Sequence, residues 1–434
     1  METHASSVAG VEAAWSDLRG IVGDEYMRAA TPENAVDGVQ PQMVIEPGSP
    51  DEISHVLKTA SSAGLQVIPR GGATKMDWGN PPRGGDLIIS TRRLNRIVEH
   101  AWGDMTATVE AGCTLQQLQQ TLAEHGQRLA LDPLWPEKAT IGGILATNDS
   151  GPLRIRFGSL RDLVIGVTLA LADGTLAKSG GKVVKNVAGY DLPKLATGSL
   201  GTLGIITQAI FRLHPIPRES RSLSFSTSDN SAMNALVLAI LDSKLVPTGV
   251  QVRAASSTPP EIDLRFEGTS AGCEAQVDQA VRLAAGSRQV GTQAGAQADV
   301  WNAPARLWDG AEPSVVCKFT LLPASMGTFF DKVREVAEQA RLQLRLAAQA
   351  VGVGLLRLEG DGAAPDVFLS AIAELRQSLE VRGGSLVVLR CPLEVKSKLD
   401  VWGSSGDALP VMKSIKAQFD PAGVLNPGRF IGGI

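Results

Sequence analysis

Apolar residues recur at helical spacing close to the start of the chain. In the stretch GSPDEISHVLKTASSAG, residues 48–64, one face of a predicted helix is formed by Ile53, Val56, Leu57 and Ala60. Ser49 is expected to cap this helix, and Glu52 to complete a capping box with it. Gly64 supplies the stop signal that helices commonly use. The pattern therefore predicts a capped amphipathic helix between Ser49 and Gly64.

The same pattern returns in residues 114–126, where Thr114 and Gln117 form the expected capping pair. The apolar face of this second helix consists of Leu115, Leu118 and Leu122. Short apolar stretches typical of strands lie around these helices, at 67–68, 86–90 and 106–112. The first 130 residues thus alternate strands and helices, with glycines at the junctions.

Residues 164–181 read as a hairpin that turns at Asp173 and Gly174. Asp191 is expected to cap a short helix, and an apolar strand follows Gly204. The composition changes in HPIPRES, residues 214–220, which is a candidate linker. Beyond it, strands are predicted at 249–254, 263–268, 315–323, 351–360 and 384–392, and helices at 231–245, 275–286, 329–344, 367–379 and 409–419.

These elements predict an α+β protein with two domains that divide at the candidate linker. The expected bounds are 1–218 for the first domain and 219–405 for a separate α+β domain. The length of 434 residues, the 44% hydrophobic content and the 20% charged content agree with a folded soluble protein of this size.

Charge and hydropathy narrow the function classes. The net charge of -4 gives no electrostatic case for nucleic acid, and no apolar run is long enough to insert into a membrane. The start of the chain lacks a secretory signal, so a cytoplasmic protein is expected, with docking on a membrane-bound partner left open. The four cysteines show no CxxC spacing and are expected to be buried free thiols.

Three glycine-rich stretches carry the candidate chemistry: PRGGATKMDWGN at 69–80, DPLWPEKATIGGILATNDSG at 132–151, and GSLGTLG at 198–204. Bare backbone lets N–H groups approach an anion closely, although each stretch by itself is better explained as ordinary turn structure. None has the GxGxxG or GxxxxGK[ST] form of the common nucleotide loops. Together they favour one extended ligand with a pyrophosphate at its centre.

In order and spacing, these stretches resemble the FAD-binding segments of the PCMH-type, vanillyl-alcohol oxidase-like flavoproteins. FDPAGVLNPGRF, residues 419–430, resembles the C-terminal return of that family to the flavin. The sequences of residues 182–195 and of this return are most similar to those of FAD-binding subunits of glycolate oxidases. The resemblance implies that residues 406–434 return to the first domain, which is then built from both ends of the chain around an inserted α+β cap domain at 219–405. It also implies FAD as cofactor and, as partners, a second flavin subunit and an iron–sulfur subunit.

Site residues are carried over from this resemblance position by position. The pyrophosphate loop would comprise Arg70, Gly71, Gly72, Ala73, Thr74, Lys75 and Gly79. Further support for the dinucleotide would come from Thr140, Gly142, Gly143, Thr147, Ser150, Gly151, Gly204, Ile205 and Ile206. Tyr190 and Asn426 are expected near the flavin ring, with simple packing an equal alternative for Tyr190.

The chain departs from the family pattern at three places. Residues 73–75 hold no histidine that could tether FAD, which predicts non-covalent binding. Leu200 stands where many members have a glutamate. The histidine-rich metal motif of related 2-hydroxy-acid dehydrogenases is reduced to Gly360-Asp361-Gly362, and no histidine follows His214. No metal is therefore expected, no catalytic residue is assigned, and the acidic residues Glu359 and Asp361 are expected to be solvated.

Three functions remain open at this point. The first is a FAD subunit of a glycolate oxidase complex, in which the partner flavin subunit performs the substrate chemistry. The second is a self-sufficient FAD oxidoreductase acting on another 2-hydroxy acid or alcohol. The third is a flavin-free scaffold that keeps the fold for assembly.

Overall fold

Two compact units make up the chain in this computed structural model, which describes residues 2–181, 190–286, 290–293 and 298–434. Unit 1 contains Met1–Ser150, Leu160–Ile216 and Ser404–Ile434, so both ends of the chain contribute to it. Unit 2 contains Gly151–Ser159 and Pro217–Gly403. Residues 151–159, which the sequence analysis placed in the first domain, group with unit 2.

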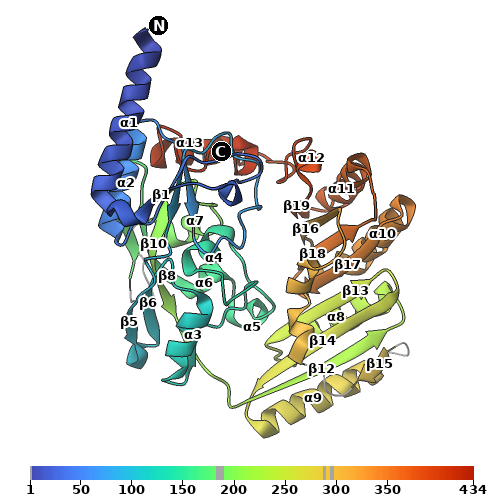
Figure 1. The fold of residues 1–434 in the computed structure, drawn as a ribbon. Coiled ribbons are helices and arrows are strands. Elements are labelled where there is room, and N and C mark those ends of the chain that lie inside the picture. Colours follow the sequence, from blue (N-terminus) through green and yellow to red (C-terminus); the bar gives the residue numbers. More distant parts are fainter. Residues whose placement is uncertain (1, 182–189, 287–289, 294–297) are drawn as a thin grey trace. The chain divides into compact units, whose positions relative to one another are not determined.

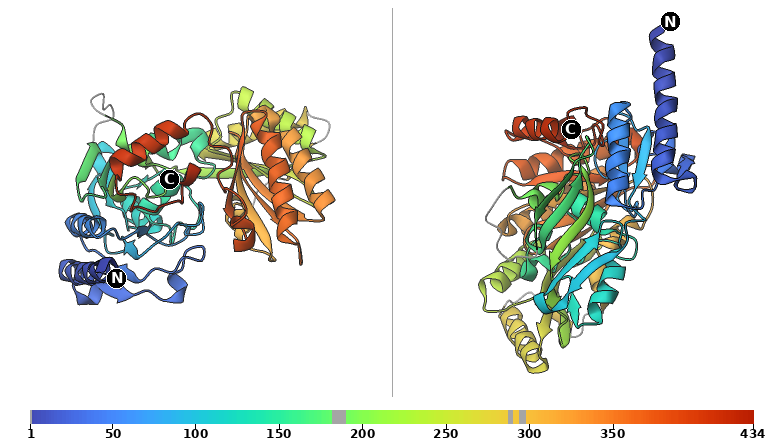
Figure 2. Two further views of the ribbon diagram at one scale, coloured as in Figure 1. Left: turned by 90° about the horizontal axis from the view of Figure 1, so that it is seen from above. Right: turned by 90° about the vertical axis from the view of Figure 1, so that its left-hand side faces the viewer.

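A four-stranded sheet and two long helices form one half of unit 1 (Figure 1). The strands lie in the order β1 (Met27–Ala29), β2 (Met43–Ile45), β4 (Leu87–Ser90) and β3 (Val67–Arg70). β2 and β3 both pair with β4 in parallel. Figure 2 shows α1 (Glu2–Val22) and α2 (Pro50–Ser62) side by side. Because β3 ends at Arg70, the first glycine-rich loop starts at the carboxyl edge of this sheet, a common location for ligands.

A five-stranded antiparallel sheet forms the other half of unit 1. Its order is β5 (Ile97–Ala101), β6 (Thr106–Glu110), β10 (Ile205–Arg212), β8 (Val164–Ala170) and β9 (Leu176–Gly180). β8 and β9 form the predicted hairpin around Asp173 and Gly174, with a positive φ of 87° at Gly174. The unit is completed by α3 (Leu115–Ala123), α4 (Ile141–Thr147), α6 (Leu160–Leu163), α7 (Leu192–Ala196), α13 (Leu409–Phe419), and the short pair β7 (Gln127–Arg128) and β11 (His214–Pro215).

The predicted helix starts are present, although the first capping box closes differently. The Ser49 hydroxyl accepts the N–H of Glu52 at 3.1 Å, but the Glu52 carboxylate accepts the N–H of Gly48 rather than that of Ser49. α3 starts in the same way, with Thr114 accepting the N–H of Gln117. The predicted apolar faces of both helices are buried.

Unit 2 is an eight-stranded antiparallel sheet with its core on one face. The strand order is β15 (Val290–Gln293), β12 (Glu219–Thr227), β14 (Thr258–Gly268), β13 (Gly249–Ala255), β17 (Gln343–Gln349), β18 (Val353–Glu359), β16 (Ser314–Thr320) and β19 (Ser385–Arg390). One hydrophobic cluster joins the sheet to α8 (Asn230–Asp242), α9 (Ser270–Ala285), α10 (Met326–Ala340) and α11 (Pro365–Glu380). The short helices α5 (Arg154–Phe157) and α12 (Leu393–Lys396) also belong to this unit.

Strands β12, β15 and β17 of this sheet were not predicted from the sequence pattern. The predicted helix 329–344 ends at Ala340 because Arg341 adopts a left-handed φ of 55°. The chain then continues as β17, which buries Leu344 and Leu346 in the core. β12 begins inside the segment expected to be a linker, and its alternation of serines with buried Leu223 and Phe225 is that of a half-buried strand.

Candidate cofactor site

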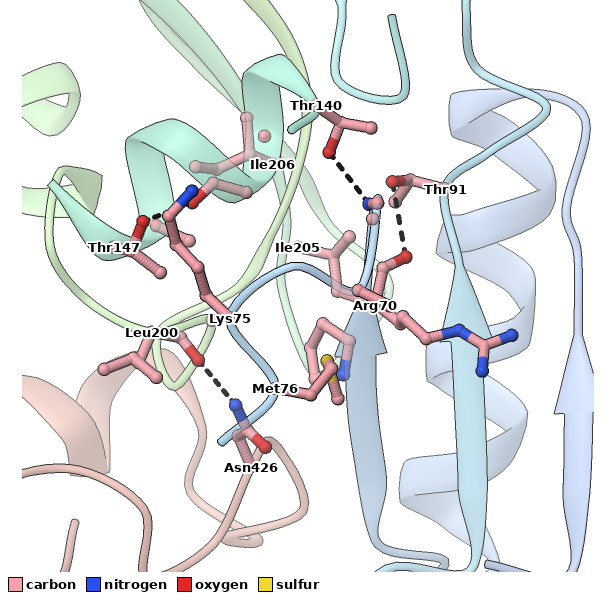
Figure 3. A pocket seen from close by; sticks show the side chains of 18 of the residues that line it. Arg70, Lys75, Met76, Thr91, Thr140, Thr147, Leu200, Ile205, Ile206 and Asn426 are labelled. Atoms are coloured by element: carbon pink, nitrogen blue, oxygen red, sulfur yellow. Dashed lines mark hydrogen bonds between the residues drawn. The ribbon is translucent and has the colours of Figure 1, made fainter. Parts of the chain in front are cut away.

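One pocket of unit 1 gathers segments that lie far apart in the sequence (Figure 3). It encloses about 730 Å³ of space, part of it open to solvent. Most of the predicted cofactor residues line it: Arg70, Gly71, Gly72, Ala73, Thr74, Lys75, Thr140, Gly142, Gly143, Thr147, Gly204, Ile205, Ile206 and Asn426. The sequence analysis did not assign the remaining lining residues, Pro69, Met76, Thr91, Ala146, Leu200, Gly201 and Arg429.

The predicted residues Gly79, Ser150, Gly151 and Tyr190 are not among those that line the pocket. Gly79 instead permits a close backbone approach, because a Cβ there would lie 2.7 Å from the carbonyl oxygen of Arg429. Gly151 belongs to unit 2. Tyr190 is 92% exposed, and its carbonyl accepts the Ser179 hydroxyl. Residues 182–189, part of the third resembling segment, lie outside the described residues.

The first glycine-rich loop packs tightly against the second glycine-rich segment. A Cβ on Gly71 would lie 2.1 Å from the Thr140 hydroxyl, and a Cβ on Gly72 would lie 1.9 Å from the Lys138 carbonyl oxygen. The Gly72 N–H donates to the Thr140 hydroxyl at 3.3 Å. Both glycines are thus required by contacts within the protein, whatever ligand the loop holds.

The same loop also offers backbone donors to an anion. The N–H groups of Gly71, Ala73 and Thr74 have no protein acceptor within the described part of the chain. Ala73 has a φ of 59°, a left-handed conformation that is unusual for a residue with a side chain and is often found at ligand sites. Free N–H groups along a glycine-rich turn are suited to phosphate oxygens.

Two backbone N–H groups at the start of α4 are bonded within the protein. The N–H of Ile141 donates to Cys113 and that of Gly142 to Ala111, both through backbone carbonyls. The Thr147 hydroxyl donates back to the carbonyl of Gly143 at 2.8 Å. The N–H groups of Ile141 and Gly142 are therefore not available to a ligand.

Leu200 connects two of the other segments through its backbone. Its N–H donates to the carbonyl of Ala146 at 2.8 Å, and its carbonyl accepts the side-chain amide of Asn426 at 2.6 Å. Leu200 has a φ of 53°, and Asn426 one of 47°. The position held by a glutamate in many family members thus serves as a junction between the third segment and the C-terminal return.

The C-terminal return is hydrogen-bonded to β3 and to the first loop. The Val67 N–H donates to the Val424 carbonyl, and the Asn426 N–H donates to the Val67 carbonyl. The buried guanidinium of Arg429 donates to the carbonyls of Met76 and Trp78. Arg429 escaped the sequence analysis, although a basic residue within NPGRF was the available signal.

The cysteines and Glu359 lie outside this pocket. Cys113, Cys273 and Cys317 are buried free thiols, as predicted, and Cys391 is partly exposed. Glu359 was expected to be solvated, but it is ion-paired 2.7 Å from the fully buried Arg357 of β18, so that expectation is wrong. Within the described ranges, no group of three or more His, Cys, Asp or Glu side chains is placed to hold a metal, and no helix has the length and apolarity to cross a membrane.

The comparisons with known proteins agree with this geometry. The FAD binding domain family matches residues 41–180, which contain the first loop and the start of α4. Residues 41–180 therefore form an FAD-binding domain. The fold of the chain is similar to that of p-cresol methylhydroxylase, with a TM-score of 0.76 at 16% identity over 97% of this chain and 96% of that chain. The predicted fold class, with its FAD-binding domain, is confirmed.

Two curated relatives match this chain almost end to end. The glycolate oxidase subunit GlcD of Bacillus subtilis is 28% identical over 93% of this chain and 91% of its own length. The D-lactate dehydrogenase of Archaeoglobus fulgidus is also 28% identical, over 90% of this chain and 91% of its own length. Both similarities extend through unit 2, well beyond the FAD-binding domain.

Proposed function

We propose that this chain is the FAD-binding subunit of a glycolate oxidase complex, which oxidises glycolate to glyoxylate and passes electrons to partner flavin and iron–sulfur subunits. The observation that carries the proposal is the similarity to the glycolate oxidase subunit GlcD over 93% of the chain. The proposed location is the cytoplasm, with contact to the inner face of the membrane through the partners.

The residues of the pocket fit the cofactor. FAD supplies the hydride acceptor for oxidation of an alcohol. The free N–H groups of Gly71, Ala73 and Thr74 would hold its phosphates, and the amide of Asn426 fixes the third segment against the C-terminal return. These contacts orient the cofactor but remove no proton from a substrate hydroxyl.

The proton of the substrate is the reason for proposing a complex. Oxidation of a 2-hydroxy acid needs a base for the hydroxyl proton, and histidine is the most frequent one. The sequence has no histidine after His214, so unit 2 contains none. We therefore assign the substrate chemistry to the partner flavin subunit.

The proposed binding of FAD is non-covalent. Residues 73–75 of the first loop are Ala, Thr and Lys and include no histidine for a tether. Acid precipitation of the purified yellow protein should release FAD into the supernatant. Flavin that stays with the washed pellet would contradict this part of the proposal.

A second candidate is a self-sufficient FAD oxidoreductase for another 2-hydroxy acid. The observation in its favour is the D-lactate dehydrogenase relative, which has the same 28% identity as the glycolate oxidase subunit. This candidate needs a base from another residue type within the chain.

Anaerobic mixing separates the two candidates. The isolated chain, loaded with FAD, is mixed with glycolate or D-lactate while the flavin absorbance is followed. Slow bleaching with both acids, and rapid turnover of glycolate once the partner subunits are added, is the expected result. Rapid and complete bleaching by either acid without partners would overturn the subunit proposal and favour the self-sufficient enzyme.

A further inference from the structure

Lys75 places a buried positive charge at the edge of the cofactor pocket. Its side chain is only 4% exposed, and it lines the pocket directly after the loop residues with free N–H groups. Its ammonium lies 3.0 Å from the carboxylate of Asp149, whose side chain is 9% exposed. The two groups are not aligned for a hydrogen bond, so this ammonium forms none within the described residues.

Two tryptophans hold the ammonium from the sides. Lys75 Nζ lies 5.7 Å from the ring centroid of Trp78 and 5.6 Å from that of Trp135, within the reach of cation–π attraction. Trp135 has a φ of 53°, a costly conformation for so large a residue. The carboxylate of Asp149 also accepts the N–H of Leu134 at 2.9 Å. The surroundings thus fix both charges in place.

The other cations of the pocket are directed elsewhere. Figure 3 shows the side chain of Lys75 running toward α4 and Thr147, whereas that of Arg70 extends in the opposite direction. The guanidinium of Arg429 donates to the carbonyls of Met76 and Trp78. Among the described cations that line the pocket, Lys75 is therefore the one whose side chain runs toward α4.

We propose that the Lys75 ammonium binds the negative charge of the FAD pyrophosphate. The Asp149 carboxylate is then the counterion that weakens the attraction between this ammonium and the phosphates. A lysine ammonium has three N–H donors, and an anionic oxygen is their best acceptor. Lys75 directly follows the loop in which the free N–H groups of Gly71, Ala73 and Thr74 are suited to the same phosphates. The inference rests on FAD binding and does not depend on which hydroxy acid is oxidised.

Three variants test the proposal in the full chain: Lys75→Met, Asp149→Asn and the double variant. Methionine keeps the unbranched stem between the tryptophans, and asparagine keeps an oxygen for the N–H of Leu134. Affinities are measured for FAD, for ADP, which carries the pyrophosphate without the flavin, and for riboflavin, which carries no phosphate. Wild-type protein that binds no FAD would refute the cofactor assignment itself, separately from the role of Lys75.

The expected pattern has opposite signs for the two single variants. Lys75→Met should weaken FAD and ADP about 10- to 100-fold, the value of a charge-assisted hydrogen bond, and should reduce the salt dependence of both affinities. Riboflavin binding should not change. Asp149→Asn should tighten FAD and ADP, because a negative charge near the phosphates is removed.

The double variant keeps the test valid if an unpaired buried Asp149 impairs folding of Lys75→Met. It should bind ADP more weakly than Asp149→Asn alone, and Lys75→Arg should retain most of the wild-type affinity. Equal weakening by Lys75→Met and Asp149→Asn would show that the pair merely holds the pocket together. A change in the flavin midpoint potential with unchanged ADP affinity would place the charge beside the flavin ring. Either result would overturn the proposal.

Discussion

Asp420 is a fully buried carboxylate that organises the C-terminal return. It accepts the N–H groups of Val424 at 3.1 Å and Leu425 at 2.8 Å, and it lies 2.6 Å from the ammonium of Lys416. The same ammonium donates to the carbonyls of Thr202 and Leu425 at 2.8 and 2.9 Å. The pair therefore links the third glycine-rich segment to the C-terminal return, although neither side chain lines the pocket.

Replacing Asp420 with alanine should destabilise unit 1 strongly. The change removes the acceptor of two backbone N–H groups and leaves the ammonium of Lys416, which is 13% exposed, without its carboxylate. Breaking a buried ion pair by removing one partner costs about 3–5 kcal/mol. Asp420→Asn keeps an oxygen for one N–H, so its cost should be nearer 2 kcal/mol. FAD affinity should also fall, because Asn426 follows this network directly.

The suitable assay is urea unfolding followed by the rise in fluorescence as FAD is released, because FAD release reports on unit 1. The matched control is Asp24→Ala, in the same unit, which breaks an exposed pair with Arg19 at 3.2 Å and should cost less than about 1 kcal/mol. If Asp420→Ala unfolds within about 1 kcal/mol of the wild type, the argument that this pair supports the cofactor site fails.

Three further predictions concern the glycine loop, pH and thiol reactivity. Gly72→Val should lose FAD in a fluorescence titration, since a Cβ there meets the Lys138 carbonyl at 1.9 Å, whereas Gly20→Ala, with nothing within 4 Å, should bind normally. Burial lowers the pKa of His214 below 6.5, so on acidification the unfolded chain takes up the proton before the folded chain does. The free energy of unfolding should therefore fall as the pH drops through that region. His214→Asn should flatten this part of the curve of unfolding free energy against pH, and an unchanged slope would refute the reasoning. Burial raises the pKa of the Cys113 thiol to about 11, so iodoacetamide at pH 8 should label it only after unfolding, and native labelling would contradict that view.

Local sequence patterns determined those helices and turns that depend only on residues a few positions apart. The helix after Ser49, the hairpin at Asp173 and Gly174 and the cap at Asp191 follow from neighbouring side chains, and all three are present in the fold. The resemblance in order and spacing likewise found the segments that line the pocket. It could do so because a dinucleotide loop needs small residues in a short run.

Tertiary structure decided what each of those residues contacts. Gly79 meets the backbone of Arg429, more than 300 positions away in the numbering, and Lys75 meets Asp149 across two glycine-rich segments. Tyr190, a candidate for the flavin ring, lies outside the pocket. Such partners depend on how the chain closes on itself, and nothing in the residues beside Gly79 or Lys75 records them. The sequence by itself thus identified an FAD-binding domain and most of the segments that line its pocket, whereas only the packed chain determined which charges and backbone groups face that pocket.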